Sequence, residues 1–226
     1  MDRRAWLDER QAAVRAAYDD GAASYDEHGY PADTQHDWMA RLLRLVPAGG
    51  TVLDAPCGTG RYFPMIAAAE LRVAGADQSA GMLAQARNRG IAFSLRQQAL
   101  QDLSYTGEFD AAATIDAMEN VPPEDWPLVL ANLSRAVRPG GHIYLTVEEA
   151  GAPEIEQAYQ NLRAQGLPAV RGEIVEGDTA GYHYYPGRDA AMAWLAAAGL
   201  AIVDEGFKQE DGWGYRHFLL RTPVAS

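Results

Sequence analysis

The chain has 226 residues, a formal net charge of −12 and a single cysteine, Cys57. This length suffices for one domain with a full core, and the acidic charge argues against a nucleic-acid partner, because such proteins carry basic surfaces that neutralise phosphates. One cysteine forms no internal disulfide, and no segment approaches the roughly 18 apolar residues of a membrane helix. The charged first residues lack the apolar run of a signal peptide, so we expect a cytoplasmic protein without a membrane partner.

The first part of the chain predicts two helices. Residues 2–20 and 34–45 carry apolar side chains at helical spacing among polar ones, as Trp38 and Leu42 do in the second segment. The pattern predicts a helical cap over about residues 1–47, ahead of the rest of a single domain.

From residue 51 onward, short apolar runs alternate with amphipathic segments. Strands are predicted at residues 51–54, 71–76, 91–96, 109–116 and 142–148. Helices are predicted at about residues 60–69, 79–89 and 122–137. This alternation is typical of a parallel sheet with helices on both faces.

The alternation breaks after Glu149. A helix is predicted at 153–165, then an aromatic run at 182–185, a helix at 188–198, and strands at 200–206 and 215–221. We interpret residues 150–186 as an insert on the substrate side, and the last two strands as a hairpin that makes the sheet mixed, with one antiparallel strand. The aromatic run either packs in the core or lines a substrate pocket.

A glycine turn leads out of the first predicted strand, in the segment Val52-Leu-Asp-Ala-Pro-Cys-Gly-Thr-Gly60. Gly58 and Gly60 allow a ligand to approach the backbone closely, and the next helix offers unpaired N–H groups. Asp54 can accept a hydrogen bond from an ammonium group, and Asp77, which closes the second strand, can hold a ribose diol. The segment alone also suits a purely structural turn.

The helix after the glycine turn discriminates between adenosine cofactors. A dinucleotide-binding turn needs a glycine or alanine at the third position of G-x-G-x-x-G/A, but Phe63 stands there and would crowd the contact between helix and strand. No phosphate-binding G-x-x-x-x-G-K-[ST] segment occurs. The sequence therefore argues against a nicotinamide or flavin dinucleotide.

Four segments together resemble the class I S-adenosylmethionine-dependent methyltransferases. They are the glycine turn, Gly75-Ala-Asp-Gln-Ser-Ala-Gly-Met-Leu83, Phe109-Asp110 and Arg138-Pro-Gly-Gly-His-Ile-Tyr-Leu145. Tyr18-Asp19 and Tyr25-Asp26 are similar to the lead-in of the small-molecule branch. The resemblance covers about residues 15–148 and implies a Rossmann-like α/β fold. That fold is a mostly parallel seven-stranded sheet with an antiparallel C-terminal strand.

The resemblance also implies the roles of individual residues. S-adenosylmethionine is the expected cofactor, and a small molecule is the expected acceptor of its methyl group by direct displacement. The implied cofactor-binding residues are Tyr18, Asp54, Pro56, Gly58, Gly60, Asp77, Gln78, Met82, Leu100, Gln101, Asp116 and Ala117. Of these, Asp77 would bind the ribose, Gln78 and Met82 the adenine, and Asp116 would lie beside the sulfonium.

The chain departs from the family pattern at three places. Pro56 replaces the first glycine of the turn, and neither Gln98 nor Asp102 matches the aspartate usual after the third strand. Asn120 stands where many relatives have histidine. The proton acceptor is therefore expected elsewhere.

The predicted catalytic residues are Glu119, His183 and Tyr25. Glu119 and His183 are the alternative bases, unless alignment of the reactants alone suffices. The resemblance implies that Tyr18 or Tyr25 positions the sulfonium and closes the site.

Two other functions stay open at this point, a nucleotide-dependent oxidoreductase and a non-catalytic module that only binds S-adenosylmethionine. The five histidines have no zinc-ligand spacing, so no metal is expected. The sequence leaves open whether oxygen, nitrogen or carbon accepts the methyl group.

Overall fold

A computed structural model describes residues 2–27, 33–176, 181–209 and 213–224. Within these residues, a seven-stranded sheet has the order β3-β2-β1-β4-β5-β9-β8. The strands are β1 (Thr51–Asp54), β2 (Arg72–Asp77), β3 (Ser94–Gln97), β4 (Phe109–Thr114), β5 (Val137–Ala150), β8 (Ala201–Gln209) and β9 (Trp213–Arg221). Strands β1 to β5 pair in parallel, and β9 runs antiparallel to both β5 and β8. The predicted mixed sheet with one antiparallel strand near the end is confirmed.

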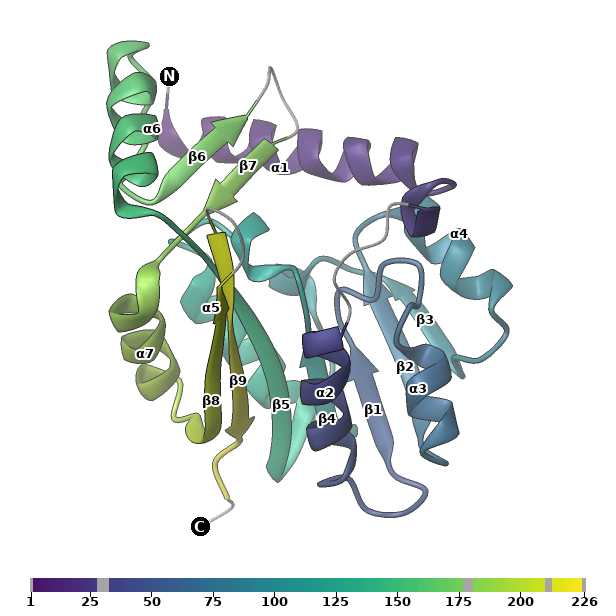
Figure 1. Ribbon diagram of the computed structural model, residues 1–226. Coiled ribbons are helices and arrows are strands. Elements are labelled where there is room, and N and C mark those ends of the chain that lie inside the picture. The colour runs from purple at the N-terminus through teal and green to yellow at the C-terminus, as the bar shows by residue number, and fades with distance from the viewer. Residues whose placement is uncertain (1, 28–32, 177–180, 210–212, 225–226) are drawn as a thin grey trace.

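Helices cover both faces of this sheet (Figure 1). One face packs against α2 (Asp33–Leu43), α3 (Phe63–Ala68) and α4 (Ala80–Asn88), and the other against α5 (Trp126–Ala136) and α7 (Gly187–Ala197). Alternate strand residues divide between the two cores, since Val52 packs with the first group and Leu53 with the second. Strands buried on both faces explain the nearly continuous apolar runs of the sequence.

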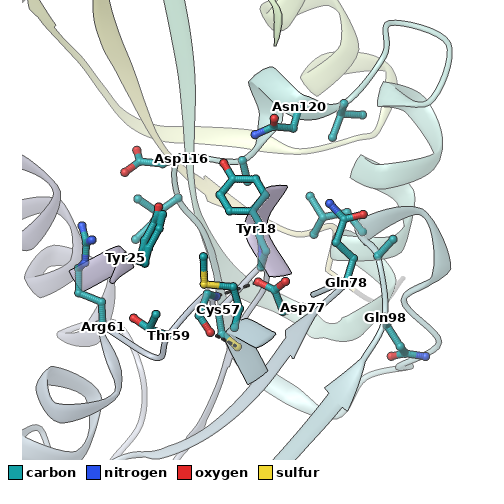
Figure 2. A pocket seen from close by; sticks show the side chains of 18 of the residues that line it. Tyr18, Tyr25, Cys57, Thr59, Arg61, Asp77, Gln78, Gln98, Asp116 and Asn120 are labelled. Atoms are coloured by element: carbon teal, nitrogen blue, oxygen red, sulfur yellow. Dashed lines mark hydrogen bonds between the residues drawn. The ribbon is translucent and has the colours of Figure 1, made fainter. Parts of the chain in front are cut away.

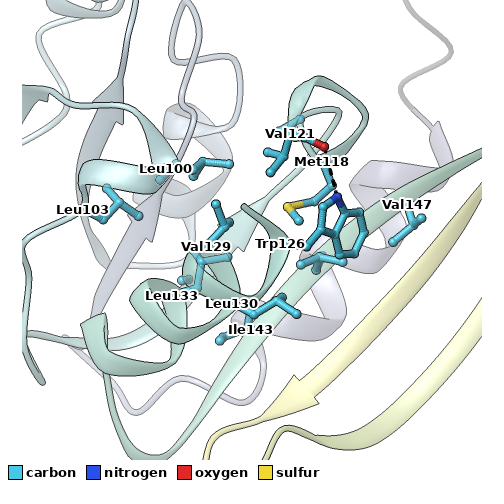
Figure 3. Packing of buried hydrophobic residues seen from close by; sticks show 14 of the residues in the cluster. Leu100, Leu103, Met118, Val121, Trp126, Val129, Leu130, Leu133, Ile143 and Val147 are labelled. Atoms are coloured by element: carbon cyan, nitrogen blue, oxygen red, sulfur yellow. Dashed lines mark hydrogen bonds between the residues drawn. The ribbon is translucent and has the colours of Figure 1, made fainter. Parts of the chain in front are cut away.

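The start of α5 differs from the prediction. The helix begins at Trp126 rather than at residue 122, and Pro122 instead accepts a turn hydrogen bond from the amide of Asp125 (2.9 Å). Pro123 disfavours helical backbone at the residue before it, which delays the helix. Figure 3 shows the Trp126 ring deep in the core, where its Nε1–H donates to the carbonyl of Val121 (3.2 Å).

Several strands also differ in length from their predictions, and β5 differs most. β3 is confined to Ser94–Gln97, because only these residues pair with β2. β5 extends to both sides of residues 142–148, since it pairs with β9 as far as Ala150 and with Phe109 of β4 at Val137.

Helix α1 (Arg3–Gly21) crosses above the carboxyl ends of the parallel strands (Figure 1). Beside it lie α6 (Ala152–Ala164) and a hairpin of β6 (Glu173–Glu176) and β7 (Gly181–Tyr184). Trp6 of α1 meets Tyr182 of β7 edge to face, with ring centroids 6.0 Å apart. β6 was not predicted, and residues 28–32 and 177–180 of the two predicted coverings lie outside the described residues.

Among the described helices, none is long and apolar enough to cross a lipid bilayer.

Candidate active site

A pocket opens at the carboxyl ends of β1, β2 and β4, beneath α1 and the short helix η1 (Tyr25–Glu27). In open α/β sheets, ligands bind at this edge. Figure 2 shows Gln78 and Gln98 on one side of the pocket and Asp116 and Arg61 on the other, with Tyr18 between them. The two ends of the pocket therefore carry different side chains, glutamines at one end and an aspartate and an arginine at the other.

The two glycines of the turn are required for different reasons. Both adopt left-handed backbone, with φ of +51° at Gly58 and +77° at Gly60. A Cβ atom on Gly60 would lie 2.6 Å from the ring of Phe63, so a side chain has no room there. A Cβ atom on Gly58 would meet nothing within 4 Å, and Gly58 lines the pocket. The turn thus presents its backbone to the open space that a ligand would fill.

Asp77 connects this turn with the one after β2. Its Oδ2 accepts from the amide of Gly58 and its Oδ1 from the amide of Ser79, both at 2.8 Å. Burial raises the pKa of the Asp77 carboxyl, and these two hydrogen bonds oppose the rise. Each carboxylate oxygen keeps a second lone pair, so both can still accept from a ligand diol.

Asp54, at the end of β1, is the least satisfied polar group nearby. Its side chain is buried, and its Oδ2 has no hydrogen-bond partner. Burial raises the pKa of this carboxyl well above its ordinary value, and the charge of Asp77 adds to the rise. A buried, unpaired carboxyl oxygen beside the glycine turn suits a cationic ligand group such as an ammonium.

Most of the predicted cofactor residues line the pocket. These are Tyr18, Pro56, Gly58, Asp77, Gln78, Met82, Leu100, Gln101, Asp116 and Ala117. Asp54 and Gly60 are buried and do not belong to the lining.

The two Tyr-Asp pairs of the N-terminal segment share one arrangement. Tyr18 and Tyr25 line the pocket and meet edge to face at 6.1 Å, while the aspartates bind the loops below. Asp19 accepts from the hydroxyl of Ser79 (2.6 Å) and the amide of Gly81 (2.9 Å). A Cβ atom on Gly81 would lie 2.7 Å from the Asp19 carbonyl, so glycine permits this close approach of α1 to α4.

Asp26 makes the second attachment, to the glycine turn itself. It accepts from the hydroxyl of Thr59 (2.7 Å) and from Arg89 (2.6 Å), and Arg89 also donates to the carbonyl of Thr59 (2.6 Å). From the sequence, both aspartates were named together with the tyrosines but were given no anchoring role, although their position directly after each tyrosine was a usable signal.

The two expected bases do not line the pocket. Glu119 lies in the short helix η3 (Met118–Asn120), where its side chain is buried and its Oε2 has no partner. Burial raises the pKa of Glu119 well above its ordinary value, with further contributions from Glu148 and Asp116. It is the neighbouring Asn120 that reaches the pocket.

His183 belongs to β7, where its Nδ1 shares a hydrogen bond with the hydroxyl of Tyr185 (3.0 Å). His183 and Tyr185 face away from Tyr182 and Tyr184, which are buried in the core, so the predicted alternation along this strand is confirmed. Tyr182 and Tyr184 therefore pack in the core, which was the first of the two interpretations given for this aromatic run.

Other side chains at the pocket were not singled out from the sequence. Arg61 and Tyr62 follow the glycine turn, and Gln11 of α1 donates to the carbonyl of Asn120 (2.6 Å). Cys57 also lines the pocket, and burial raises the pKa of its thiol, which disfavours the thiolate that would react. No group of three or more metal-ligating side chains occurs in the part of the chain that the structure describes.

A pocket at this edge of a parallel sheet, with aspartates closing its first two strands, defines a protein that binds an adenosine-containing cofactor. Comparison with known proteins identifies which kind. A family model described as "Methyltransferase domain" matches residues 52–141. The chain is 32% identical to demethylmenaquinone methyltransferase of Parafrankia sp., over 88% of this chain and 91% of that protein. It belongs to the S-adenosylmethionine-dependent methyltransferases.

Two further similarities are less complete, since one covers only part of the relative and the other shows the fold alone. The chain is 33% identical to malonyl-[acyl-carrier protein] O-methyltransferase of Pectobacterium atrosepticum over 66% of its own length, and spans 59% of that protein. A solved structure of 1,6-didemethyltoxoflavin-N1-methyltransferase from Burkholderia thailandensis, with bound 1,6-didemethyltoxoflavin and S-adenosylhomocysteine, has a TM-score of 0.67. It covers 99% of this chain and 91% of its own at 18% identity, and therefore shows the shared fold.

Proposed function

We propose that this enzyme transfers the methyl group of S-adenosylmethionine to a small-molecule acceptor by direct displacement. The observation that carries the proposal is a glycine turn that opens into the pocket and is held by Asp77, a lining residue whose two carboxylate oxygens can still accept from a ligand diol. Bound S-adenosylmethionine supplies an electrophilic methyl group on a sulfonium, so the protein's main task is to align an acceptor with it.

The chain's own residues then divide the work of binding. Asp77 holds the ribose hydroxyls of the cofactor, Gln78 and Met82 flank the adenine, and the buried charge of Asp54 attracts the amino group. Tyr18 and Tyr25 cover the methyl-bearing end from α1 and η1.

The acceptors named for the relatives provide the first probes. Malonyl-[acyl-carrier protein] and demethylmenaquinone differ in charge and shape, and both fit the class of small or carrier-linked acceptors. The absence of a metal and of a nucleic-acid partner, and the cytoplasmic location, remain predictions from the composition.

Calorimetry and product analysis test this function together. We expect S-adenosylmethionine and S-adenosylhomocysteine to bind and NAD to show no heat of binding. A labelled methyl group should then appear on an acceptor from cell extract or from the two probes. Preference for NAD would favour the oxidoreductase, and tight cofactor binding without any labelled product would favour the non-catalytic module.

A further inference from the structure

Asp116, directly after β4, has an unusual backbone. Its φ is +49°, a left-handed value that non-glycine residues seldom adopt, and its amide donates to the buried hydroxyl of Thr146 on β5 (2.8 Å). Such strained residues persist only where the surroundings hold them, and they cluster at functional sites. The strain here directs the Asp116 side chain into the lining of the pocket.

The Asp116 carboxyl is held from two other elements. Nε2 of Gln35, on α2, lies 3.4 Å from Oδ1, and the Tyr215 hydroxyl of β9 donates to the carboxyl as well. Gln35 is itself buried, and its Oε1 has no partner. Burial raises the pKa of Asp116, whereas the hydrogen bonds from Gln35 and Tyr215 and the charge of Arg61 oppose the rise. A carboxylate in this state is a stronger base than one in water.

The other lining residues at this end are mainly aromatic and apolar. Tyr18, Tyr25 and Tyr62 contribute ring faces and edges, and Ile115 and Val121 contribute aliphatic surface. Among the described residues of the lining, Arg61 is the single cation, and it lies near Asp116. This environment suits a flat, uncharged acceptor, because the charge of Arg61 already opposes that of Asp116, so an acceptor carboxylate would lose its hydration there without a second cation to pair with.

We infer that Asp116 accepts the proton of the methyl acceptor, and that the acceptor is a planar, neutral molecule whose reacting atom carries a proton, as a ring hydroxyl does. The inference rests on the proposed methyl transfer and names its acceptor class. It also replaces Glu119 and His183 as the base, since neither lines the pocket.

In the proposed step, the acceptor's proton passes to the Asp116 carboxylate, and a lone pair of the acceptor atom forms the new bond to the methyl carbon. The electron pair of the broken carbon–sulfur bond stays on sulfur, so the cationic sulfonium becomes a neutral thioether. Asp116 then releases its proton to water, and the charge of the site is restored.

Several titratable groups face Asp116 and contribute to its titration. They are Arg61 and Tyr62 before α3, Glu119 in η3, Tyr144 on β5 and Tyr215 on β9. Because Asp116→Asn retains all of these groups, its comparison with the wild type isolates the one carboxyl.

The first test needs no acceptor. An ionised Asp116 beside the sulfonium favours the cationic S-adenosylmethionine over neutral S-adenosylhomocysteine, so the ratio of the two affinities should rise with pH through the titration of Asp116. We expect a rise of roughly three- to tenfold in calorimetry, and a flat ratio in Asp116→Asn. Asparagine tolerates left-handed backbone as aspartate does, so the variant keeps the fold.

Asp204→Asn is the matched control. Asp204 is an exposed carboxylate on β8 that pairs with Arg41 (2.9 Å), and its variant should retain the wild-type pH dependence. If neither cofactor form binds the wild type, the proposed function itself fails. If both bind and their affinity ratio does not change with pH, only the role of Asp116 is overturned.

The second test uses the two acceptor probes. With demethylmenaquinone supplied as its two-electron-reduced quinol, which bears the ring hydroxyls that the quinone lacks, Asp116→Asn should lower kcat about 10²–10⁴-fold while S-adenosylhomocysteine affinity stays within about twofold. In wild type, kcat should rise with pH as Asp116 ionises, and in Asp116→Asn this rise of kcat with pH should be absent. Methylation of the malonyl carboxylate at a rate that Asp116→Asn leaves unchanged would overturn the inference.

Discussion

The carboxylate of Asp77 holds two backbone amides at once, and this limits what can replace it. Its two oxygens accept from Gly58 and Ser79, which belong to turns after different strands. The side chain thus shapes the pocket before any ligand arrives. Loss of ligand affinity and loss of stability are therefore coupled at this position.

We predict that Asp77→Asn weakens both properties. The amide group can accept only one of the two backbone hydrogen bonds, and its NH₂ then faces an N–H donor. We expect S-adenosylhomocysteine binding to weaken by roughly 1.5–3 kcal/mol and the free energy of unfolding to fall by about 1–3 kcal/mol. Calorimetry and urea denaturation measure the two effects. Asp102→Asn, the same change at an exposed residue outside the lining, should alter neither, and an unaltered Asp77→Asn would refute the ribose role.

At this scale, sequence reasoning succeeds where a role follows from neighbours along the chain. Asp77 and Gly58 were identifiable because a strand, a turn and a helix define their positions locally. Which of Asp116 and Glu119 directs its carboxyl into the pocket was not identifiable, because the two residues lie only three positions apart along the chain. That direction depends on the left-handed backbone of Asp116 and on partners from α2 and β9, which no local pattern contains.

Two elements that cover the site, α1 and η1, are attached to it by side chains rather than by sheet pairing. Asp26 of η1 binds Thr59 and Arg89, and this contact joins the cover directly to the glycine turn. Arg89 and Asp26 are both partly exposed, so salt should weaken the contact.

We predict that Asp26→Asn speeds release of the cofactor. Without the charge, η1 and Tyr25 leave the pocket more often, so S-adenosylhomocysteine should dissociate roughly two- to tenfold faster in stopped-flow measurements. The free energy of unfolding should change by less than about 0.5 kcal/mol, because the residue is exposed. Glu27→Gln, at the next acidic residue of η1, is the control. Equal release rates in Asp26→Asn and wild type would rule out this attachment as a closing device.

The insert depends on one buried carboxylate. Glu173 of β6 accepts from Arg3 of α1 (2.8 Å), the hydroxyl of Tyr182 (2.8 Å) and the amide of Val170 (2.7 Å). Its side chain is fully buried, whereas Arg3 is partly exposed and also pairs with Glu124. Arg3 therefore links the first turn of α1 to the hairpin.

We predict that Arg3→Ala loosens the insert and destabilises the protein. Removing the cation leaves the Glu173 carboxylate buried with two hydrogen bonds and no opposite charge, which we expect to cost about 1–3 kcal/mol of unfolding free energy. Hydrogen exchange should speed up in β6 and β7 first. Arg4→Ala is the control and should cost about 0–1 kcal/mol, since Arg4 and its partner Asp8 are exposed and its buried partner Asp125 keeps a hydrogen bond from Gln101. Equal costs for the two variants would contradict this role.

Periodicity predicted the elements of the sheet better than those of the insert. The parallel strands are buried on both faces and separated by amphipathic helices, so each leaves a clear apolar run. β6 leaves none, because Glu173 is charged and its burial depends on Arg3, 170 residues away in sequence. The start of α5 was misplaced for a local reason, the pair of prolines before it.

For the whole molecule, the net charge of −12 hides two opposite kinds of carboxyl group. Burial without a partner raises the pKa of Asp54 in the folded chain. Burial alone would also raise the pKa of Asp110, but the amide of Thr51 and the guanidinium of Arg138 outweigh it and lower that pKa. A carboxyl group whose pKa is raised in the folded chain stabilises the fold at pH values below its ordinary pKa, and this stabilisation is lost as pH rises through the raised pKa. A carboxyl group whose pKa is lowered stabilises the fold at pH values above its ordinary pKa, and this stabilisation is lost as pH falls through the lowered pKa.

We therefore predict that Asp54→Asn and Asp110→Asn change stability with opposite pH dependence. Without ligand, Asp54→Asn should gain unfolding free energy relative to wild type as pH rises from the ordinary carboxyl range toward neutrality, because the variant has no buried charge to form. Asp110→Asn should lose stability relative to wild type as pH rises from strongly acidic values to the ordinary carboxyl range, since the wild type gains its ion pair there, and the loss should stay constant from that range to neutrality. Urea denaturation at several pH values measures both differences.

Saturating S-adenosylhomocysteine should reverse the result for Asp54→Asn and leave that for Asp110→Asn unchanged. The ligand's ammonium group then pairs with the ionised Asp54, so the carboxylate stabilises the liganded fold at neutral pH. A gain in stability for Asp54→Asn that persists at saturating ligand would show that Asp54 does not contact the ammonium group. Measuring the same variants with and without ligand therefore distinguishes the destabilisation caused by an unpaired buried carboxylate from the contribution of that carboxylate to ligand binding.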